Sequence, residues 1–212
     1  MTIFLTGGTG YMGRRLIAQL SANGHTVRAL VRPGSRNKLP AGCEPVIGDA
    51  LDAATYRVQV APAEVFVHLI GVAHPSPSKA EQFRSVDLAS VRAAVSAAVS
   101  AGIRHFVYVS VAHPAPVMHA YIAARSEAED LIRAAAMNAT ILRPWYVLGP
   151  GHRWPLLLQP LYWVAERYPG TRDSARRLGL VTIAQMIAAL ATAVERCPRG
   201  VRVMEVPEIR RG

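Results

Sequence analysis

Tyr121 and Arg125 are the pair of residues in this sequence whose types and spacing best suit proton chemistry. Both lie in the segment 118–136, which has helical periodicity, and side chains four positions apart share one face of a helix. A cation beside a phenol favours the ionised form and lowers its pKa, which prepares the tyrosine to donate or accept a proton. A guanidinium is never deprotonated, so Arg125 offers Tyr121 a positive field but no proton relay.

A glycine-rich segment, TGGTGYMG at 6–13, follows a short apolar run and opens a helical pattern. Gly7, Gly10 and Gly13 have the spacing in which the first glycine allows a tight turn and the second lets the backbone approach a pyrophosphate. The third allows a helix to pack closely on a strand, and the helix N-terminus offers N–H groups to the anion. A purely structural turn is the alternative, but the position between the first strand and the first helix favours a dinucleotide site.

The segment after the second expected strand, RPGSRNK at 32–38, carries cations and no acid. An acid there binds a free ribose 2'-hydroxyl, whereas arginine accommodates a 2'-phosphate. This segment therefore favours NADP(H) over NAD(H), through Arg32, Ser35, Arg36 and Lys38. A loop of solvated cations is the alternative. Asp49, after the third expected strand, is placed to accept a hydrogen bond from the adenine amino group, although a surface turn would look the same.

The elements that must position these residues alternate between strand and helix. Apolar or alternating runs predict strands at 2–7, 25–32, 44–49, 63–71, 104–111 and 139–144. Helical spacing predicts helices at 11–24, 79–102 and 118–136. This order implies right-handed crossovers and a parallel sheet with helices on both faces, a Rossmann-type doubly wound α/β fold.

The chain is expected to form one compact domain. Residues 1–150 form the dinucleotide-binding core, and residues 151–181, rich in Pro, Trp and Arg, form a small C-terminal excursion on the substrate side. Residues 182–212 return to the core as a helix and a strand. The oligomeric state is left open between monomer and homodimer.

Composition narrows the function classes and the location. The net charge of +10 invites a nucleic-acid hypothesis, but the cations are nearly all arginines spread along the chain, which argues against it. Apolar runs stop well short of the ~20 residues that a membrane span requires, and no secretory signal is visible. Cys43 and Cys197 are isolated, as in a reducing compartment. A cytoplasmic location is expected.

Several of these segments together resemble a known family, the extended and atypical short-chain dehydrogenase/reductases, including NAD-dependent epimerase/dehydratase-like and NmrA-like members. The resemblance covers nearly the whole chain. It rests on TGGTGYMG, on the Gly-Asp pair after the third strand, on VFVHLIG, on AGIRHFVYVS, on Tyr121 with Arg125, and on ATILRPWYVLGPG.

This resemblance implies a set of cofactor-binding residues. The pyrophosphate would be held by Gly7, Thr9, Gly10, Tyr11, Met12 and Gly13. Arg32 would bind the 2'-phosphate, and the adenine would contact Asp49 and Ala50. The remaining contacts to the cofactor would come from Leu69, Ile70, Gly71, Ser110, Tyr121, Arg125 and Pro144.

The sequence departs from the catalytic members of this family in two places. Their tyrosine is followed four residues later by lysine, where this chain has Arg125. They also follow the fifth strand with hydroxyl residues, the third of which hydrogen-bonds the substrate carbonyl, but here Ser110 is followed by two apolar residues, Val111 and Ala112. His113 or His119 are candidates to replace that donor, and incidental loop histidines are the alternative.

Histidines and aromatic residues near the expected cofactor edge raise two further questions. No metal site is predicted, because no helix-spaced Cys or carboxylate partner accompanies His74, His113, His119 or His152. An aromatic wall for an apolar substrate, or simply the core of the small lobe, would be built by Trp145, Tyr146, Trp154, Tyr162 and Trp163.

The leading hypothesis is an NADP(H)-dependent reductase or epimerase/dehydratase-like oxidoreductase that acts on a small carbonyl or hydroxyl compound. Its catalytic residues would be Tyr121 as acid and base, Arg125 as electrostatic support, and Ser110. The alternative is an NAD(P)(H)-binding redox sensor or accessory subunit without turnover, which the apolar Ala112 motivates.

Overall fold

The computed structural model describes residues 1–150, 173 and 176–211. Its main feature is a seven-stranded parallel sheet with the order β3-β2-β1-β4-β5-β6-β9. The strands are β1 (Thr2–Thr6), β2 (Thr26–Val31), β3 (Cys43–Ile47), β4 (Val65–His68), β5 (His105–Val109), β6 (Ala139–Arg143) and β9 (Val201–Glu205). The predicted doubly wound α/β fold is confirmed.

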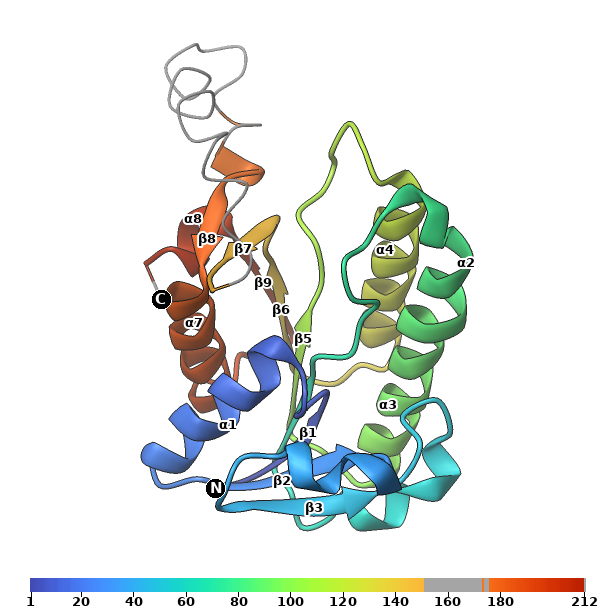
Figure 1. Cartoon of the computed structure of the whole chain (residues 1–212), viewed down its shortest axis with the longest axis vertical. Helices are drawn as coiled ribbons and strands as arrows, with labels where there is room; N and C mark the ends of the chain where they lie inside the picture. The colour runs from blue at the N-terminus through green and yellow to red at the C-terminus, as the bar shows by residue number, and fades with distance from the viewer. Residues whose placement is uncertain (151–172, 174–175, 212) are drawn as a thin grey trace.

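Helices cover both faces of this sheet (Figure 1). One face carries α1 (Tyr11–Ala22) and α7 (Ile183–Glu195), and the other carries α3 (Ala89–Ser100) and α4 (His119–Ala134). The short elements are η1 (Pro33–Lys38), η2 (Ala53–Thr55), η3 (Arg57–Gln59), η4 (Pro77–Lys79), α2 (Ala80–Gln82), η5 (Phe83–Leu88) and α8 (Val206–Ile209).

Alternation along the central strands divides the core into two layers. Ile3 and Leu5 of β1 pack in the cluster that contains the buried faces of α1 and α7, whereas Phe4 packs in the cluster under α3 and α4. Phe4 continues into an aromatic row on that second face, because the ring centroids of Phe66 lie 5.1 Å from Phe4 and 5.2 Å from Phe106. Successive side chains of a strand point to opposite faces, so each continuous apolar run fills both layers.

The helix predicted at 79–102 differs from a regular helix in its first half. Helical structure runs from η4 to α3, but η5 is a π-helical turn. A π-turn accommodates an extra residue and changes which side chains face inward, and such turns are frequent at functional sites. Here it leaves both Phe83 and Asp87 buried.

A second, two-stranded parallel sheet joins β7 (Tyr146–Leu148) to β8 (Leu180–Thr182). The sequence pattern did not predict either strand. Thr182 then caps α7, since its Oγ1 accepts a hydrogen bond from the Gln185 backbone while the Gln185 side chain accepts one from the Thr182 backbone. The C-terminal segment lies on the main sheet, where β9 pairs with β6. Most of the predicted excursion at 151–181, including Trp154, Tyr162 and Trp163, lies outside the described residues.

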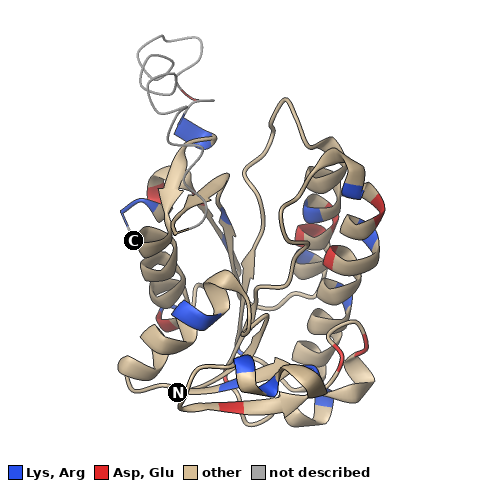
Figure 2. Ribbon diagram, viewed as in Figure 1, with Lys and Arg blue, Asp and Glu red and all other residues tan. Residues whose placement is uncertain are grey.

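Lysine and arginine residues lie on both helical layers, interspersed with acidic residues (Figure 2). Several are paired with carboxylates at the surface, such as Arg92 with Glu127 at 2.6 Å and Arg104 with Glu64 at 3.2 Å. Within the described part of the chain, no helix is long and apolar enough to cross a membrane.

Candidate active site

The carboxyl ends of the parallel strands meet at one edge of the sheet, and a cavity of about 590 Å³ opens there. Ten of the residues that the sequence analysis assigned to the site line this cavity: Gly7, Gly10, Tyr11, Met12, Gly13, Leu69, Ile70, Gly71, Tyr121 and Arg125. The others are Val72, Ala73, His74, Pro75, Val109, Val111, Met118, Trp145, Tyr146 and Val147. A cavity of this size suits a cofactor end and a small substrate together.

The glycine loop has the geometry that a dinucleotide site requires. Gly7 adopts a φ of 82°, in the left-handed region that side chains disfavour. Gly10 precedes α1 and offers no side-chain cap, and the first turn of α1 contains no acidic residue. The helix N-terminus therefore offers backbone N–H groups and a positive dipole end, features that suit an anion such as a phosphate.

Replacing Gly13 with alanine is expected to destabilise the protein by about 1–3 kcal/mol. A methyl group there would overlap the carbonyl oxygen of Gly7 and lie 2.8 Å from the Cα of Gly8. The measurement is the urea unfolding midpoint. The matched control is Gly34→Ala, because a methyl group at Gly34 meets no atom within 4 Å. Equal stability of the two variants would contradict the close packing of helix and loop.

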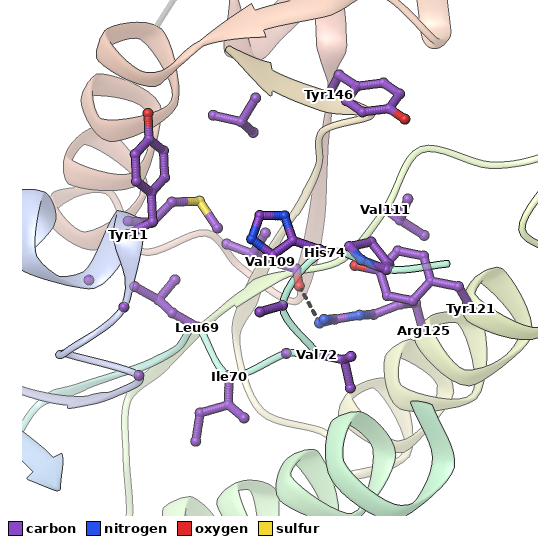
Figure 3. A pocket seen from close by; sticks show the side chains of 18 of the residues that line it. Tyr11, Leu69, Ile70, Val72, His74, Val109, Val111, Tyr121, Arg125 and Tyr146 are labelled. Carbon is purple, nitrogen blue, oxygen red and sulfur yellow. Dashed lines mark hydrogen bonds between the residues drawn. The ribbon is translucent and has the colours of Figure 1, made fainter. Parts of the chain in front are cut away.

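Tyr121 and Arg125 lie in α4 and line the same cavity as the glycine loop (Figure 3). The Tyr121 ring packs against Phe83 of the π-turn, with centroids 4.9 Å apart. The Arg125 guanidinium carbon lies 5.1 Å from the centre of the Tyr121 ring. Tyr121 and Arg125 therefore share one face of α4, as predicted, and the Tyr121 side chain lines the cavity beside the glycine loop.

The guanidinium of Arg125 donates hydrogen bonds to three residues that lie far from it in the sequence. Nη2 donates to Asp87 Oδ1 at 2.5 Å, and Nη1 donates to the Val109 carbonyl at 2.9 Å and to Tyr108 Oη at 3.1 Å. The side chains of Arg125 and Asp87 are 6% and 1% exposed. Burial alone would lower the pKa of Arg125, but Tyr108, Tyr121 and Asp87 raise it, so the guanidinium stays charged and opposite a carboxylate.

Asp87 and Gly71 connect this ion pair to the wall of the cavity. Asp87 Oδ2 accepts a hydrogen bond from the Val72 backbone at 3.1 Å. A methyl group on Gly71 would overlap Arg125 Nη2 and lie 3.2 Å from Asp87 Oδ1. The missing side chain at Gly71 thus gives the guanidinium its space, in addition to the role beneath the cofactor that the family resemblance implies.

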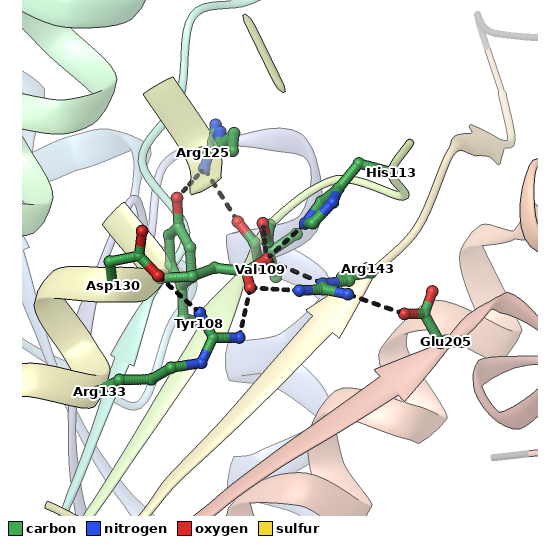
Figure 4. A network of polar contacts seen from close by, with 10 residues as sticks. Tyr108, Val109, His113, Arg125, Asp130, Arg133, Arg143 and Glu205 are labelled. Atoms are coloured by element: carbon green, nitrogen blue, oxygen red, sulfur yellow. Dashed lines mark hydrogen bonds and ion pairs between the residues drawn. The ribbon is translucent and has the colours of Figure 1, made fainter. Parts of the chain in front are cut away.

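Ser110 belongs to a second polar network, which also contains Arg133, Arg143 and Glu205, labelled in Figure 4. Its hydroxyl donates to Glu129 Oε1 at 2.6 Å, and Glu129 also accepts from Arg143 at 2.5 Å and from Arg133 at 2.8 Å. Burial alone would raise the pKa of Glu129, but the bonds from Arg143, Ser110 and Arg133 outweigh it and lower the pKa. Arg143 extends the network to Glu205 of β9. Ser110 is buried and does not line the cavity.

Several predicted cofactor residues lie at the same sheet edge but outside the cavity lining. Arg32 follows β2 and Asp49 follows β3, and these strands pair in parallel up to Val31 and Ile47. Both residues are exposed, as is Arg36. Asp49 Oδ1 accepts a hydrogen bond from the Leu51 backbone. The others outside the lining are Thr9, Ser35, Lys38, Ala50, Ser110 and Pro144. Their contacts with a cofactor stay predictions.

Of the four candidate histidines, His152 lies outside the described residues, and the other three are divided between the cavity and its surroundings. His74 lines the cavity in a left-handed conformation with φ of 49° and, in the view of Figure 3, lies between Tyr11 and Tyr121. His113 faces the second network, with Nε2 3.5 Å from Glu129, and His119 is exposed at the start of α4. Neither of the two proposed replacement donors lines the cavity. The described residues contain no cluster of three potential metal ligands.

Asp87, Tyr108 and Glu129 bind the side chains of Arg125 or Ser110 and were not predicted from the sequence. Asp87 lies within a helical pattern, and its acidic side chain among apolar neighbours was the available signal, because a carboxylate is rarely buried without a partner. Glu129 carried no such signal, since a glutamate in SEAED at 126–130 is ordinary for an exposed helix face.

A family model for NAD(P)H-binding proteins matches residues 7–152. Among curated proteins, the chain is 34% identical over 151 residues to a ceramide reductase from Caulobacter vibrioides, covering 70% of this chain and 47% of the reductase. It is 29% identical over 171 residues to a 4-hydroxy-2-methyl-3-oxo-4-farnesyl-3,4-dihydroquinoline-1-oxide ketoreductase from Stigmatella aurantiaca, covering 70% and 51%. The chain thus spans about half the length of these relatives.

Solved structures share the fold at low identity. A short-chain dehydrogenase/reductase superfamily protein from Agrobacterium tumefaciens with bound NAD superposes with a TM-score of 0.70 at 20% identity, covering 97% of this chain and 77% of that one. A UDP-glucose 4-epimerase from Thermotoga maritima gives 0.70 at 16%, covering 100% and 81%. These likenesses concern the fold. The family model covers the glycine loop and strands β2 to β7, more than half of the chain, and the chain therefore belongs to the NAD(P)H-binding family.

Proposed function

We propose that the protein is an NADP(H)-dependent reductase of a small carbonyl compound, with Tyr121 as the proton donor. The observation that carries this proposal is that the glycine loop and Tyr121 line one cavity, with Ile70 and Gly71 also in its wall. The names of the ceramide reductase and of the ketoreductase support reduction rather than epimerisation.

The chain's own residues would divide the work in a simple way. The glycine loop would hold the pyrophosphate, and bound NADPH would supply a hydride to the carbonyl carbon. Tyr121 would donate its phenolic proton to the carbonyl oxygen, as a general acid does. Arg125 would keep a positive field near that phenol, weakened by Asp87, whose carboxylate lies 2.5 Å from the guanidinium.

The assay that tests this proposal is NADPH consumption with a panel of aldehydes and ketones. Turnover that depends on the Tyr121 hydroxyl supports it. If NADPH binds but no carbonyl compound is reduced, the reductase proposal fails.

The 2'-phosphate preference rests on the exposed cations after β2. Replacing Arg32 and Arg36 together with alanine is expected to weaken NADPH binding roughly 10- to 100-fold, as hydrogen bonds to charged groups are worth about 1.5–3 kcal/mol. NADH binding should not change. Calorimetric titration with both cofactors measures the difference, and Arg57→Ala, another exposed arginine, is the control. Equal losses for both cofactors would contradict a 2'-phosphate contact.

A cofactor-binding protein without turnover is the second candidate, and one observation favours it. The Ser110 hydroxyl is committed to Glu129, and no Ser or Thr is found among the described lining residues. No hydroxyl side chain is therefore available there to polarise a carbonyl except those of the tyrosines. Tight NADPH binding together with a cofactor-dependent change in partner binding, and no turnover, would favour this candidate.

A further inference from the structure

We infer that the cavity selects an uncharged, lipophilic carbonyl compound and disfavours substrates that carry a phosphate or a carboxylate next to the carbonyl. This inference rests on the proposed reductase function. It concerns the lining residues outside the glycine loop, where the substrate would lie.

This part of the lining comes from three segments and is mainly apolar. Val72 and Pro75 follow β4, whereas Val111 and Met118 belong to the segment between β5 and α4. Trp145 contributes from the connection between β6 and β7. Aliphatic and aromatic surface of this kind binds apolar groups, because contact removes both surfaces from water.

Trp145 belongs to an aromatic pair in this wall. Its ring meets Tyr146 edge to face, with centroids 6.0 Å apart and planes at 89°. Both residues line the cavity, which favours the aromatic wall over the lobe core for these two positions. An edge-to-face pair presents a broad apolar surface with a hydroxyl at its rim.

The charge balance of the wall separates neutral from anionic substrates. Among the described lining residues, Arg125 is the one Lys, Arg, Asp or Glu, and its charge is already opposed by Asp87 at 2.5 Å. Lys79 lies behind the wall, where its amine donates to the carbonyls of Ala73 and His74. A buried anion requires a cation and hydrogen bonds to offset its lost hydration, and the part of this wall that the structure describes offers no unopposed Arg or Lys.

Three side chains of the lining outside the glycine loop carry polar atoms of the kind that bind a carbonyl or a hydroxyl. They are His74, Tyr121 and Tyr146. A small number of polar side chains in an apolar wall orient a ligand by hydrogen bonds while the wall supplies affinity. The site thus fits a molecule with one oxygen function on an apolar skeleton.

The test compares two 2-oxo compounds with the same alkyl chain, one with a neutral methyl ester and the other with a carboxylate next to the ketone. The full chain, saturated with NADPH, is assayed with methyl 2-oxooctanoate and with 2-oxooctanoate. The ester is expected to have a kcat/KM at least about 10-fold higher, a difference that burial of one unpaired charge readily exceeds. Within a series of esters, kcat/KM should rise about fourfold for each added methylene until the cavity is filled.

A cation placed in the wall should reduce this preference. Met118→Lys keeps an unbranched side chain, lengthens it by one atom and adds a cation at a lining position. The ester-to-acid ratio should then fall about 10-fold or more, as an ion pair in a partly buried site replaces apolar contact. Val117→Lys is the matched control, because the neighbouring Val117 is 52% exposed and does not line the cavity. This control should keep the wild-type ratio.

Failure of this inference can be told apart from failure of the proposed function. A wild-type preference for the acid, or an unchanged ratio in Met118→Lys, overturns the inference while reduction itself stands. If neither compound nor any other carbonyl is reduced, the reductase proposal fails, and calorimetry of both compounds with the NADPH-saturated protein decides the ligand class. Tighter binding of the ester supports the inference, whereas tighter binding of the acid, or binding of neither, overturns it.

Discussion

Tyr121→Phe is expected to lower kcat for carbonyl reduction about 100- to 10,000-fold, the usual contribution of a general acid. NADPH affinity and stability should remain at wild-type values. Phenylalanine retains the ring that packs on Phe83 at 4.9 Å and lies 5.1 Å from the Arg125 guanidinium carbon. The substitution therefore removes the proton donor and little else. Steady-state kinetics, together with calorimetric titration of NADPH, separates the two effects.

A second tyrosine in the chain provides the control for this experiment. Tyr56 is fully buried, stacks on Phe4 with centroids 5.9 Å apart, and does not line the cavity. Tyr56→Phe removes a hydroxyl of the same kind and should leave kcat unchanged. If Tyr121→Phe retains wild-type turnover, Tyr121 is not the acid, and His74 becomes the next titratable side chain in the cavity to test.

Asp87→Ala is expected to lower the free energy of unfolding by about 3–5 kcal/mol, because it leaves a buried guanidinium without its carboxylate. The same change removes the acceptor of the Val72 backbone N–H, so the wall of the cavity loses an anchor. Chemical denaturation measures the loss. Weakened substrate binding should accompany it, since Val72 lines the cavity.

Two further variants show whether the loss comes from the unpaired charge. Asp87→Ala combined with Arg125→Met removes both charges and should recover a substantial part of the stability, as replacement of whole buried ion pairs by apolar residues often does. Glu64→Ala breaks the exposed pair with Arg104, whose side chains are 43% and 71% exposed, and should cost about 0–1 kcal/mol. If Asp87→Ala cost no more than Glu64→Ala, the Asp87–Arg125 pair would not have the structural role described.

Local sequence patterns were sufficient to predict most strands and helices of the fold. Glycine spacing, apolar runs and their alternation with helical segments predicted the loop at Gly7, Gly10 and Gly13 and the parallel sheet that follows from it. These features depend on neighbouring residues, because backbone conformation and strand burial are set within a few positions of the chain. The spacing of Tyr121 and Arg125 likewise determined that both lie on one face of α4.

The partners of the buried charges were decided only by the tertiary structure. Asp87 is 38 positions from Arg125 and reaches it because a π-turn, which helical periodicity does not predict, leaves the carboxylate buried in the helix that packs beside α4. The Ser110 hydroxyl likewise donates to Glu129 of α4, and Ser110 does not line the cavity. Such pairings cross between elements, and their selection depends on which side chains can be desolvated together when the helices pack on the sheet. The sequence alone therefore predicted the glycine loop and a tyrosine paired with a cation, and only the packed structure determined that they line one cavity and how much charge is left beside them.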